Sequence, residues 1–486
     1  MSKPDTHETS LKRDLKNRHV QLIAIGGCIG TGLFMGSGKT IAAAGPSVLV
    51  IYAVIGVMLY FLMRAMGEIL LSDSRYRSFA EFSEDLLGPW AGYVTGWSYW
   101  CAWMVTAMAE IIAIAGYCNY WWPELPTWIP ALITVFLLVG INLFTVKAFG
   151  EIEFWFALIK ILAILSLIAL GIVLVVQGFV SPEGDPAQIA NLWSYGGLFP
   201  KGEAGLLTGF RTAVFAFVGM EVVGITAAEV KDPETVLPRA INSIPIRILG
   251  FYLGTLAVLM MVTPWPHIAA DRSPFVGMFS LTGFLAAASL VNFVVVTSAS
   301  SSANSGTYTT SRMIYGLAMG GDASPWYRKL SSRGVPIHGL WMTCIMLFLS
   351  VALLAAGETV MEAFDRVTSV ASLLFIFVWS MILISYFIYR ARRPELHAQS
   401  RFKMPMGLFM SVIVLLFFGF LLYTLWLDPE SRETLLILPA WFVILTLVYF
   451  LIIRRHPDHA ERRARFKAKV DEEWKKAAAF RARQAT

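Results

Sequence analysis

The sequence predicts an all-α polytopic membrane protein with about twelve transmembrane helices. Of its 486 residues, 57% are hydrophobic, and the mean hydropathy is +0.63. A soluble chain of this length has no core large enough to bury so many apolar side chains. Windows of about 20 apolar residues, long enough to cross a bilayer as helices, fall at residues 20–44, 47–71, 90–121, 128–146, 154–176, 206–228, 244–263, 286–305, 339–356, 363–390, 408–427 and 435–453.

Two of these windows are interrupted by glycines. The first contains Gly26, Gly27, Gly30 and Gly32, and the sixth carries a lone carboxylate, Glu221, in a glycine-broken stretch. An unwound segment persists in hydrocarbon only where a ligand, water or other protein satisfies its backbone groups. Close helix packing through small residues is the alternative for either segment alone. Two such breaks in one membrane chain favour the binding site of a secondary transporter.

The distribution of Lys and Arg predicts the orientation. Basic residues gather in the segments that share one side with both termini, such as the loops with Arg75, Lys231 and Arg328, whereas the opposite loops hold few. The positive-inside rule therefore predicts cytoplasmic termini. The expected organisation is a cytoplasmic N-terminal segment (1–19), a transmembrane transporter domain (20–453) and a cytoplasmic basic C-terminal tail (454–486).

The tail mixes basic, acidic and alanine residues, which predicts either a helix at the anionic lipid surface or a solvated tail without a specific function. The net charge of +6 comes from the tail and the loops, so a nucleic-acid partner is not expected. The lipid bilayer is the expected surroundings.

Several site types are not expected. The four cysteines fall inside predicted spans and are interpreted as packing residues, and the positions of the seven histidines do not favour a metal site. Gly38-Lys39-Thr40 resembles the end of a phosphate loop, but the required first glycine falls on Leu33, so no nucleotide is expected. We find no nucleophile with a matching base, and therefore expect neither an enzyme nor a cofactor.

The third window presents one continuous helical face formed by Tyr99, Trp103, Thr106 and Glu110. Large rings beside a cavity would favour small substrates. The alternative is that Tyr99 and Trp103 pack between helices or lie near the membrane interface, where aromatic residues concentrate.

Two ionisable residues inside the windows are functional candidates, because such groups are costly in a membrane. Lys160 either extends its stem toward the cytoplasm or has a role inside the bundle. Glu221 either carries a proton or is a permanently hydrogen-bonded brace for the unwound segment.

The same segments carry a family resemblance. Gly30-Thr31-Gly32-Leu33-Phe34, Phe217-Val218-Gly219-Met220-Glu221, and Glu229 to Pro233 followed by Pro238 to Ile241 resemble the signatures of bacterial amino-acid permeases of the amino acid–polyamine–organocation superfamily. Within that family, residues 17–27, 238–247 and 301–306 most resemble the members that carry D-serine, D-alanine and glycine. The resemblance covers the chain up to Arg455, so the tail departs from it. It implies two inverted five-helix repeats with broken helices 1 and 6, plus two extra helices.

The resemblance also implies a main-chain substrate site. The N–H groups of Thr31 and Gly32 would hold the substrate carboxylate, and carbonyls of Cys28, Phe215 and Val218 would accept from its ammonium. Ile29, Gly30 and Gly219 complete the implied set, with Tyr99 and Trp103 as its wall. Lys160 would take the place where sodium-coupled relatives hold a cation between helices one, five and eight. Lys160 and Glu221 are the two candidates for the residue that couples proton movement to transport.

The implied function is proton-coupled symport of small neutral amino acids, such as D-alanine, D-serine and glycine, across the bacterial inner membrane. The proton gradient would be the energy source, and the amino acid and the proton the partners. Alternatives are a permease for other neutral or aromatic L-amino acids, and a sensor that binds an amino acid without moving it. The chain has no sizeable soluble domain, which disfavours the sensor.

Overall fold

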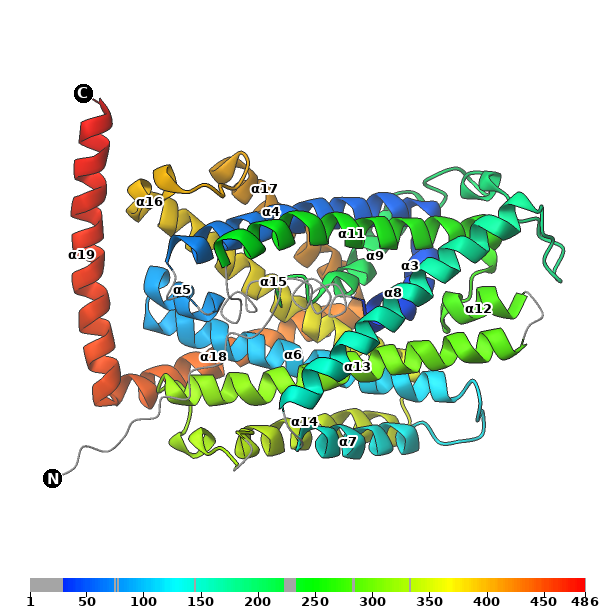
Figure 1. Ribbon diagram of the computed structural model, residues 1–486, viewed down its shortest axis with the longest axis horizontal. Helices are drawn as coiled ribbons and strands as arrows, with labels where there is room; N and C mark the ends of the chain where they lie inside the picture. Colours follow the sequence, from blue (N-terminus) through cyan, green and yellow to red (C-terminus); the bar gives the residue numbers. More distant parts are fainter. Residues whose placement is uncertain are drawn as a thin grey trace.

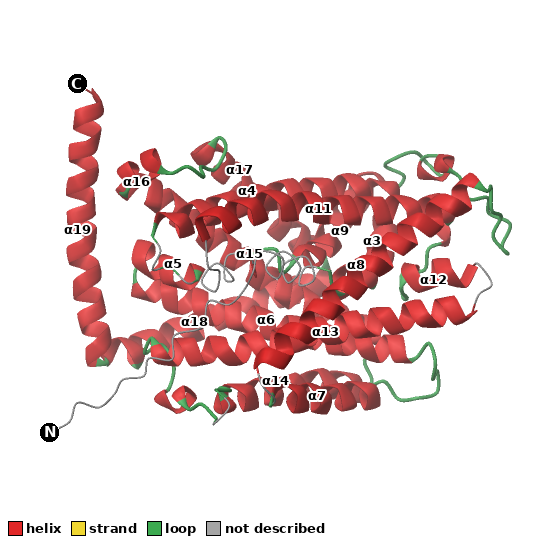
Figure 2. Cartoon of the chain, in the orientation of Figure 1, coloured by secondary structure: helices red, strands yellow, loops and turns green. Residues whose placement is uncertain are grey.

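The structure is a computed structural model that describes residues 29–73, 76, 78–143, 146–222, 233–281, 285–331 and 334–485. Within these ranges the regular elements are helices (Figure 2). The long helices are α4 (Val48–Ser72), α6 (Pro89–Cys118), α7 (Trp128–Asn142), α8 (Val146–Val176), α11 (Pro233–Val262), α13 (Leu285–Met319), α14 (Ile337–Ala355), α15 (Val360–Arg392), α17 (Gly407–Leu427), α18 (Pro429–Leu451) and α19 (Pro457–Ala485).

Short helices connect or interrupt the long ones. The α-helices among them are α2 (Thr31–Phe34), α3 (Gly36–Ala44), α5 (Phe79–Leu87), α9 (Gly202–Ala213), α12 (Pro274–Leu281) and α16 (Pro394–Gln399). The 3₁₀ helices are η1 (Gly45–Ser47), η2 (Ile189–Leu192), η3 (Val214–Phe217), η5 (Trp265–His267), η6 (Pro325–Arg328) and η7 (Ile453–Arg455).

The expected polytopic helical fold is confirmed. The described residues contain 9 helices long and apolar enough to cross a membrane, and α7 is a shorter apolar helix. The predicted windows at 47–71, 339–356 and 408–427 agree with α4, α14 and α17 to within two residues at each end. The sixth window is divided between α9 and η3, so it is broken as predicted.

The predicted end of the eighth window, 286–305, is wrong, because α13 continues to Met319. Polar residues beyond the window bond to their own helix: the hydroxyl groups of Thr307 and Thr310 donate to the carbonyls of Ala303 and Gly306, each over 2.8 Å. Their hydroxyls are thus satisfied without leaving the helix. The seventh window, 244–263, was also too short, since α11 begins at Pro233.

One helix, α6, lies at the centre of the bundle. Of its apolar window 78% is buried inside the protein, compared with 11% for α18, whose side chains mainly face outward. It packs against α13 on one side and α15 on the other, while α4 and α11 pack against each other. In Figure 1 these helices run along the long axis of the molecule. The candidate site lies between these two groups.

The C-terminal tail is a helix that crosses one end of the bundle. Figure 1 shows α19 running nearly perpendicular to the spans, beside α5 and α16. It contacts α15, α16 and α6. The tail is therefore a helix, as the first of our two expectations required. It packs on other helices of the protein, whereas that expectation placed it at the lipid surface. We call this end the α19 end and the opposite one the α12 end.

Candidate functional site

Of the first predicted break, residues 26–32, the structure describes Ile29 onward. The backbone of Gly30 is extended (φ −132°, ψ −160°), and α2 begins at Thr31 and ends at Phe34 after one turn. Met35 separates α2 from α3. The residues of α2 are buried. The first N–H groups of α2 thus follow directly on the extended Gly30, and N–H groups at the start of a helix can bind anions. Cys28 lies outside the described residues.

The second break follows η3. Val218 is extended (φ −60°, ψ 138°), and Gly219 has a φ of +99°, a conformation that L side chains rarely adopt. The N–H of Val218 donates to the carbonyl of Phe215 over 3.2 Å, which closes a tight turn. A carbonyl oxygen has two lone pairs, so Phe215 keeps acceptor capacity. The N–H of Met220 likewise donates to the carbonyl of Phe217 over 3.4 Å, so these carbonyls are engaged by turn contacts and not by a continuous helix.

The two breaks meet backbone to backbone. A Cβ atom added to Gly32 would lie 2.7 Å from the Cα of Ala216 and 3.1 Å from the carbonyl oxygen of Phe215. Only a residue without a side chain allows this approach. The N–H end of α2 and the carbonyl groups of η3 therefore lie side by side, as recognition of both ends of an amino acid requires.

Glu221 braces the second break. One carboxylate oxygen accepts the N–H of Gly219 over 3.2 Å, and the other accepts the hydroxyl of Tyr99 over 3.3 Å. The side chain is 1% exposed. The carboxylate thus holds the left-handed Gly219 and links the break to α6. These bonds are those that the bracing role of Glu221 requires, and its proton-carrying role stays a prediction.

Tyr252 is a second brace, which the sequence did not predict. Its hydroxyl donates to the carbonyl of Ala216 over 2.7 Å. Its ring contacts Phe217 and Tyr52, with centroids 5.4 and 5.8 Å away. A carbonyl freed by the end of a helix is costly when buried, and Tyr252 satisfies it. The only sequence signal was a tyrosine inside a predicted apolar span.

A buried glutamate and a buried lysine lie beside the first break. Glu110 accepts the N–H of Thr31 over 3.4 Å, and Lys160 attracts it electrostatically. Lys160 is fully buried and donates to the hydroxyl of Ser302 over 3.1 Å. That hydroxyl lies 3.5 Å from the position of a Cβ on Gly30. Lys160 therefore stays inside the bundle and does not extend toward the surface.

One face of α6 reaches both breaks. Tyr99 bonds to Glu221 at the second break, and Glu110, eleven positions further on, bonds to Thr31 at the first. Trp103 and Thr106 lie between them on the same face, and all four side chains are buried. Phe375 of α15 packs near the rings of Tyr99 and Trp103, with centroid distances of 6.0 and 6.1 Å. The predicted wall residues therefore do lie next to the breaks.

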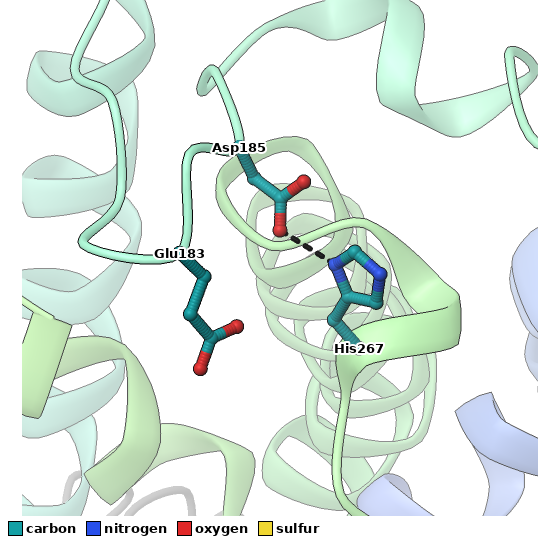
Figure 3. A group of neighbouring side chains, drawn as sticks. All are labelled: Glu183, Asp185 and His267. Carbon is teal, nitrogen blue, oxygen red and sulfur yellow. Dashed lines mark hydrogen bonds and ion pairs between the residues drawn. The ribbon is translucent and has the colours of Figure 1, made fainter.

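A separate group at the α12 end has metal-ligand chemistry. Glu183, Asp185 and His267 place one potential ligand atom each within 4.8 Å of one another (Figure 3). Asp185 is already paired with the Nδ1 atom of His267. The same loop is joined to the end of α11 by the N–H of Gln188, which donates to the carbonyl of Met261 over 2.9 Å. We therefore interpret this group as a contact between two loops.

The arrangement defines a class of protein: a multi-pass membrane protein in which the short helix α2 and the backbone of η3 meet inside a helical bundle, as the half-helices of secondary transporters do. A family model described as amino acid permease matches residues 19–462, and the chain belongs to this family. It is 55% identical over 445 residues, 92% of this chain and 95% of the relative, to a D-serine/D-alanine/glycine transporter of Escherichia coli (strain K12). It is 47% identical to the amino-acid permease AapA of Bacillus subtilis (strain 168), over 92% of this chain and 96% of that one.

We predict that Gly32→Ala abolishes most transport, because its methyl group would collide with the backbone of Ala216. Forced overlap in a packed region costs about 1–3 kcal/mol, so the half-saturating substrate concentration should rise roughly 5- to 150-fold. Gly36→Ala is the matched control, since its nearest neighbour, the carbonyl of Thr31, is 4.0 Å away. Uptake normalised to the amount of protein in the membrane measures both variants. Equal uptake by the two would contradict the close approach of the breaks.

A second prediction concerns Tyr252→Phe, which leaves the ring in place and removes the hydrogen bond to the carbonyl of Ala216. An unsatisfied buried acceptor costs about 1–3 kcal/mol. We expect weaker apparent substrate affinity in competition assays with little change in the amount of folded protein. Tyr52→Phe removes a hydroxyl from the same ring cluster without removing a bond to η3, and should retain normal affinity. If both variants lose affinity alike, the ring cluster and not the hydrogen bond positions the break.

Proposed function

We propose that this protein is a proton-coupled symporter that imports small neutral amino acids, namely D-alanine, D-serine and glycine. The observation that carries this proposal is the approach of Gly32 to Ala216, which brings N–H groups and carbonyl groups together within the bundle. Such a pair of backbone ends matches the carboxylate and the ammonium common to all amino acids. The names of the relatives support the choice of substrate.

The N–H groups of Thr31 and Gly32 bind the substrate carboxylate in this proposal. The carbonyls of Phe215 and Val218, with that of Cys28, accept from its ammonium. Main-chain groups make these contacts, and they bind only the parts common to all amino acids. Selection among substrate side chains therefore depends on the residues that form the wall of the site. Tyr99, Trp103 and Phe375 are large and packed together, which supports a preference for small substrates.

Coupling involves Glu110 and Lys160. Glu110 accepts the N–H of Thr31, the group proposed to bind the substrate carboxylate. An arriving carboxylate therefore competes with Glu110 for this N–H, and a proton on Glu110 or a stronger attraction to Lys160 removes the competition. A proton that accompanies a zwitterion carries one net charge inward, worth about 2.3 kcal/mol per 100 mV. Glu221 remains the alternative carrier.

The proposed setting is the bacterial cytoplasmic membrane, with the α19 end facing the cytoplasm. The basic loops predicted to be inside support this orientation. About twelve spans in two inverted five-helix repeats, with helices 1 and 6 interrupted, is the architecture that we propose for the family fold. The positions of the two breaks, in the first and sixth apolar windows, support it.

The direct test is uptake of labelled glycine and D-alanine by proteoliposomes, with and without an imposed pH gradient. Accumulation above the external concentration only with an inward proton gradient supports the symporter. Preference for aromatic or other L-amino acids would support the alternative permease. Saturable binding without uptake would identify a sensor.

The wall generates a prediction about substrate size. Trp103→Ala should admit larger neutral amino acids and weaken glycine transport, because it removes a ring that packs against both Tyr99 and Phe375. A size series from glycine to phenylalanine in competition assays measures the preference. Trp100→Ala truncates the same residue type on α6, where its ring contacts Trp97, and should keep the original order. An unchanged order for Trp103→Ala would assign that ring to packing.

Lys160→Ala should remove accumulation driven by a pH gradient, while exchange of substrate across the membrane persists. The reason is that Glu110 then loses the charge that attracts it away from Thr31, whereas the backbone site remains. Proteoliposomes with an imposed pH gradient measure accumulation, and preloaded ones measure exchange. Lys201→Ala, an exposed lysine ahead of α9, is the control and should accumulate normally. Undiminished accumulation by Lys160→Ala would make Glu221 the leading proton carrier.

A further inference from the structure

The helix α19 has a buried face with regular spacing. His459, Arg462, Phe466, Lys469 and Glu473 follow one another at intervals of three or four residues, and all are at least partly buried. Ala477, one turn further on, is 1% exposed. This spacing marks one stripe of an amphipathic helix. The family model ends at residue 462, so most of the stripe lies beyond the part that the family shares.

The first part of the stripe joins α5 to the end of α13. Arg462 donates to Glu84 of α5 over 2.8 Å and to Asp322, in the turn after α13, over 3.0 Å. It also donates to the carbonyl of Gly320 over 2.7 Å. One guanidinium therefore holds two segments that are far apart in the sequence, with the fork geometry that suits carboxylates.

The second part of the stripe joins α5 to the end of α15. Lys469 is paired with Asp85, which also accepts from Arg393 directly after α15. Arg393 in turn donates to Glu473 over 2.9 Å. Burial would raise the pKa of Asp85, but the bonds from Lys469, Tyr76 and Arg393 outweigh it and lower its pKa to about 2. Asp85 therefore stays charged at every pH near neutrality.

The charges fix a single register for α19. Basic residues, Arg462 and Lys469, face acidic groups of the bundle, and the acidic Glu473 faces Arg393. If α19 shifted by one helical turn, its charged residues would lose their oppositely charged partners on the bundle, and residues of like charge would come together. Between these pairs, the ring of Phe466 packs against Gly88, where a Cβ atom would lie 3.3 Å from it. The helix is thus docked by complementary charge and shape.

The segments held by α19 are those that carry the walls of the candidate site. α5 leads through Gly88 into α6, which contributes Tyr99 and Glu110. α13 contributes Ser302, and α15 contributes Phe375. We propose that α19 is an electrostatic clamp that holds the ends of α5, α13 and α15 together and thereby slows the conformational cycle of the transporter.

We expect α19 to slow the cycle, and not to speed it, because in alternating access groups of helices rock against one another around a fixed site. Any step that separates the three clamped ends must first break the ion pairs of α19 or carry α19 along. Breaking the pairs beforehand lowers the barrier to that step. This consequence for transport rests on the proposed function, whereas docking of the helix does not.

Docking is tested with a cysteine reporter in the full-length chain. Ala477→Cys places a thiol on the buried face, and Ala478→Cys places one on the exposed face of the same turn. The membranes are labelled with a maleimide-linked polyethylene glycol, and the protein without a reporter gives the baseline from its own cysteines. We expect at least fivefold slower labelling at 477 than at 478. Equal labelling of the two positions would overturn the docked helix.

The clamp is then opened by Glu473→Lys, which puts a positive charge beside Arg393. Glu472→Lys makes the same change at the next residue, which is exposed and paired within α19 to Lys476. Labelling at 477 should rise at least fivefold with Glu473→Lys and stay unchanged with Glu472→Lys. A double variant with Arg393→Glu and Glu473→Lys restores opposite charges at this pair and should restore part of the protection.

Transport by the same variants decides the role of the clamp. Glu473→Lys should raise the maximal rate of glycine uptake at least twofold per molecule in the membrane, and Glu472→Lys should not. Exposure of residue 477 without a higher maximal rate would overturn the slowing role while leaving the docked helix in place. If the unaltered protein moves neither glycine nor D-alanine, the proposed function fails, and the labelling result still decides whether α19 docks.

Discussion

The site depends on one constraint: inside hydrocarbon, every backbone N–H and carbonyl group needs a hydrogen-bond partner. At the start of α2 and after η3, backbone N–H and carbonyl groups lie outside a continuous helix and need other partners. Side chains form hydrogen bonds with these groups: Glu110 of α6 accepts from Thr31, Glu221 of the second break itself accepts from Gly219, and Tyr252 of α11 donates to Ala216. The breaks are therefore stable only within the assembled bundle.

The same contacts give the two breaks different characters. At the second break both partners of the backbone, Glu221 and Tyr252, are held by further bonds or rings, so this side is rigidly braced. At the first break the partner is Glu110, whose bond to Thr31 is long at 3.4 Å and whose other carboxylate oxygen is buried without a hydrogen-bond partner among the described residues. The second break is thus held by several contacts, whereas the described start of α2 depends on one long bond.

Hydropathy and glycine spacing were sufficient to predict the helical bundle and its interrupted helices, because membrane insertion depends on local composition. They placed Gly32 and Glu221 at the breaks. They could not predict Tyr252, since the residue that satisfies a freed carbonyl is chosen by the packing of α11 against η3. Nor could they predict the end of α13, where hydroxyls bonded to their own helix extend it beyond the apolar window. The register of α19 depends on carboxylates of α5 and α13, which no window of the tail contains.

The separation of Thr31 and Glu110 along the chain also has a consequence for biosynthesis. The two residues are 79 positions apart, and a ribosome adds about 5–20 residues per second, so the partner of the Thr31 N–H is made roughly 4 to 16 s later. Until α6 enters the membrane, the start of α2 has no acceptor from Glu110 and is poorly suited to lipid. The start of α2 therefore gains this contact only after the third span has been made, so its local structure is completed by a segment that is synthesised later.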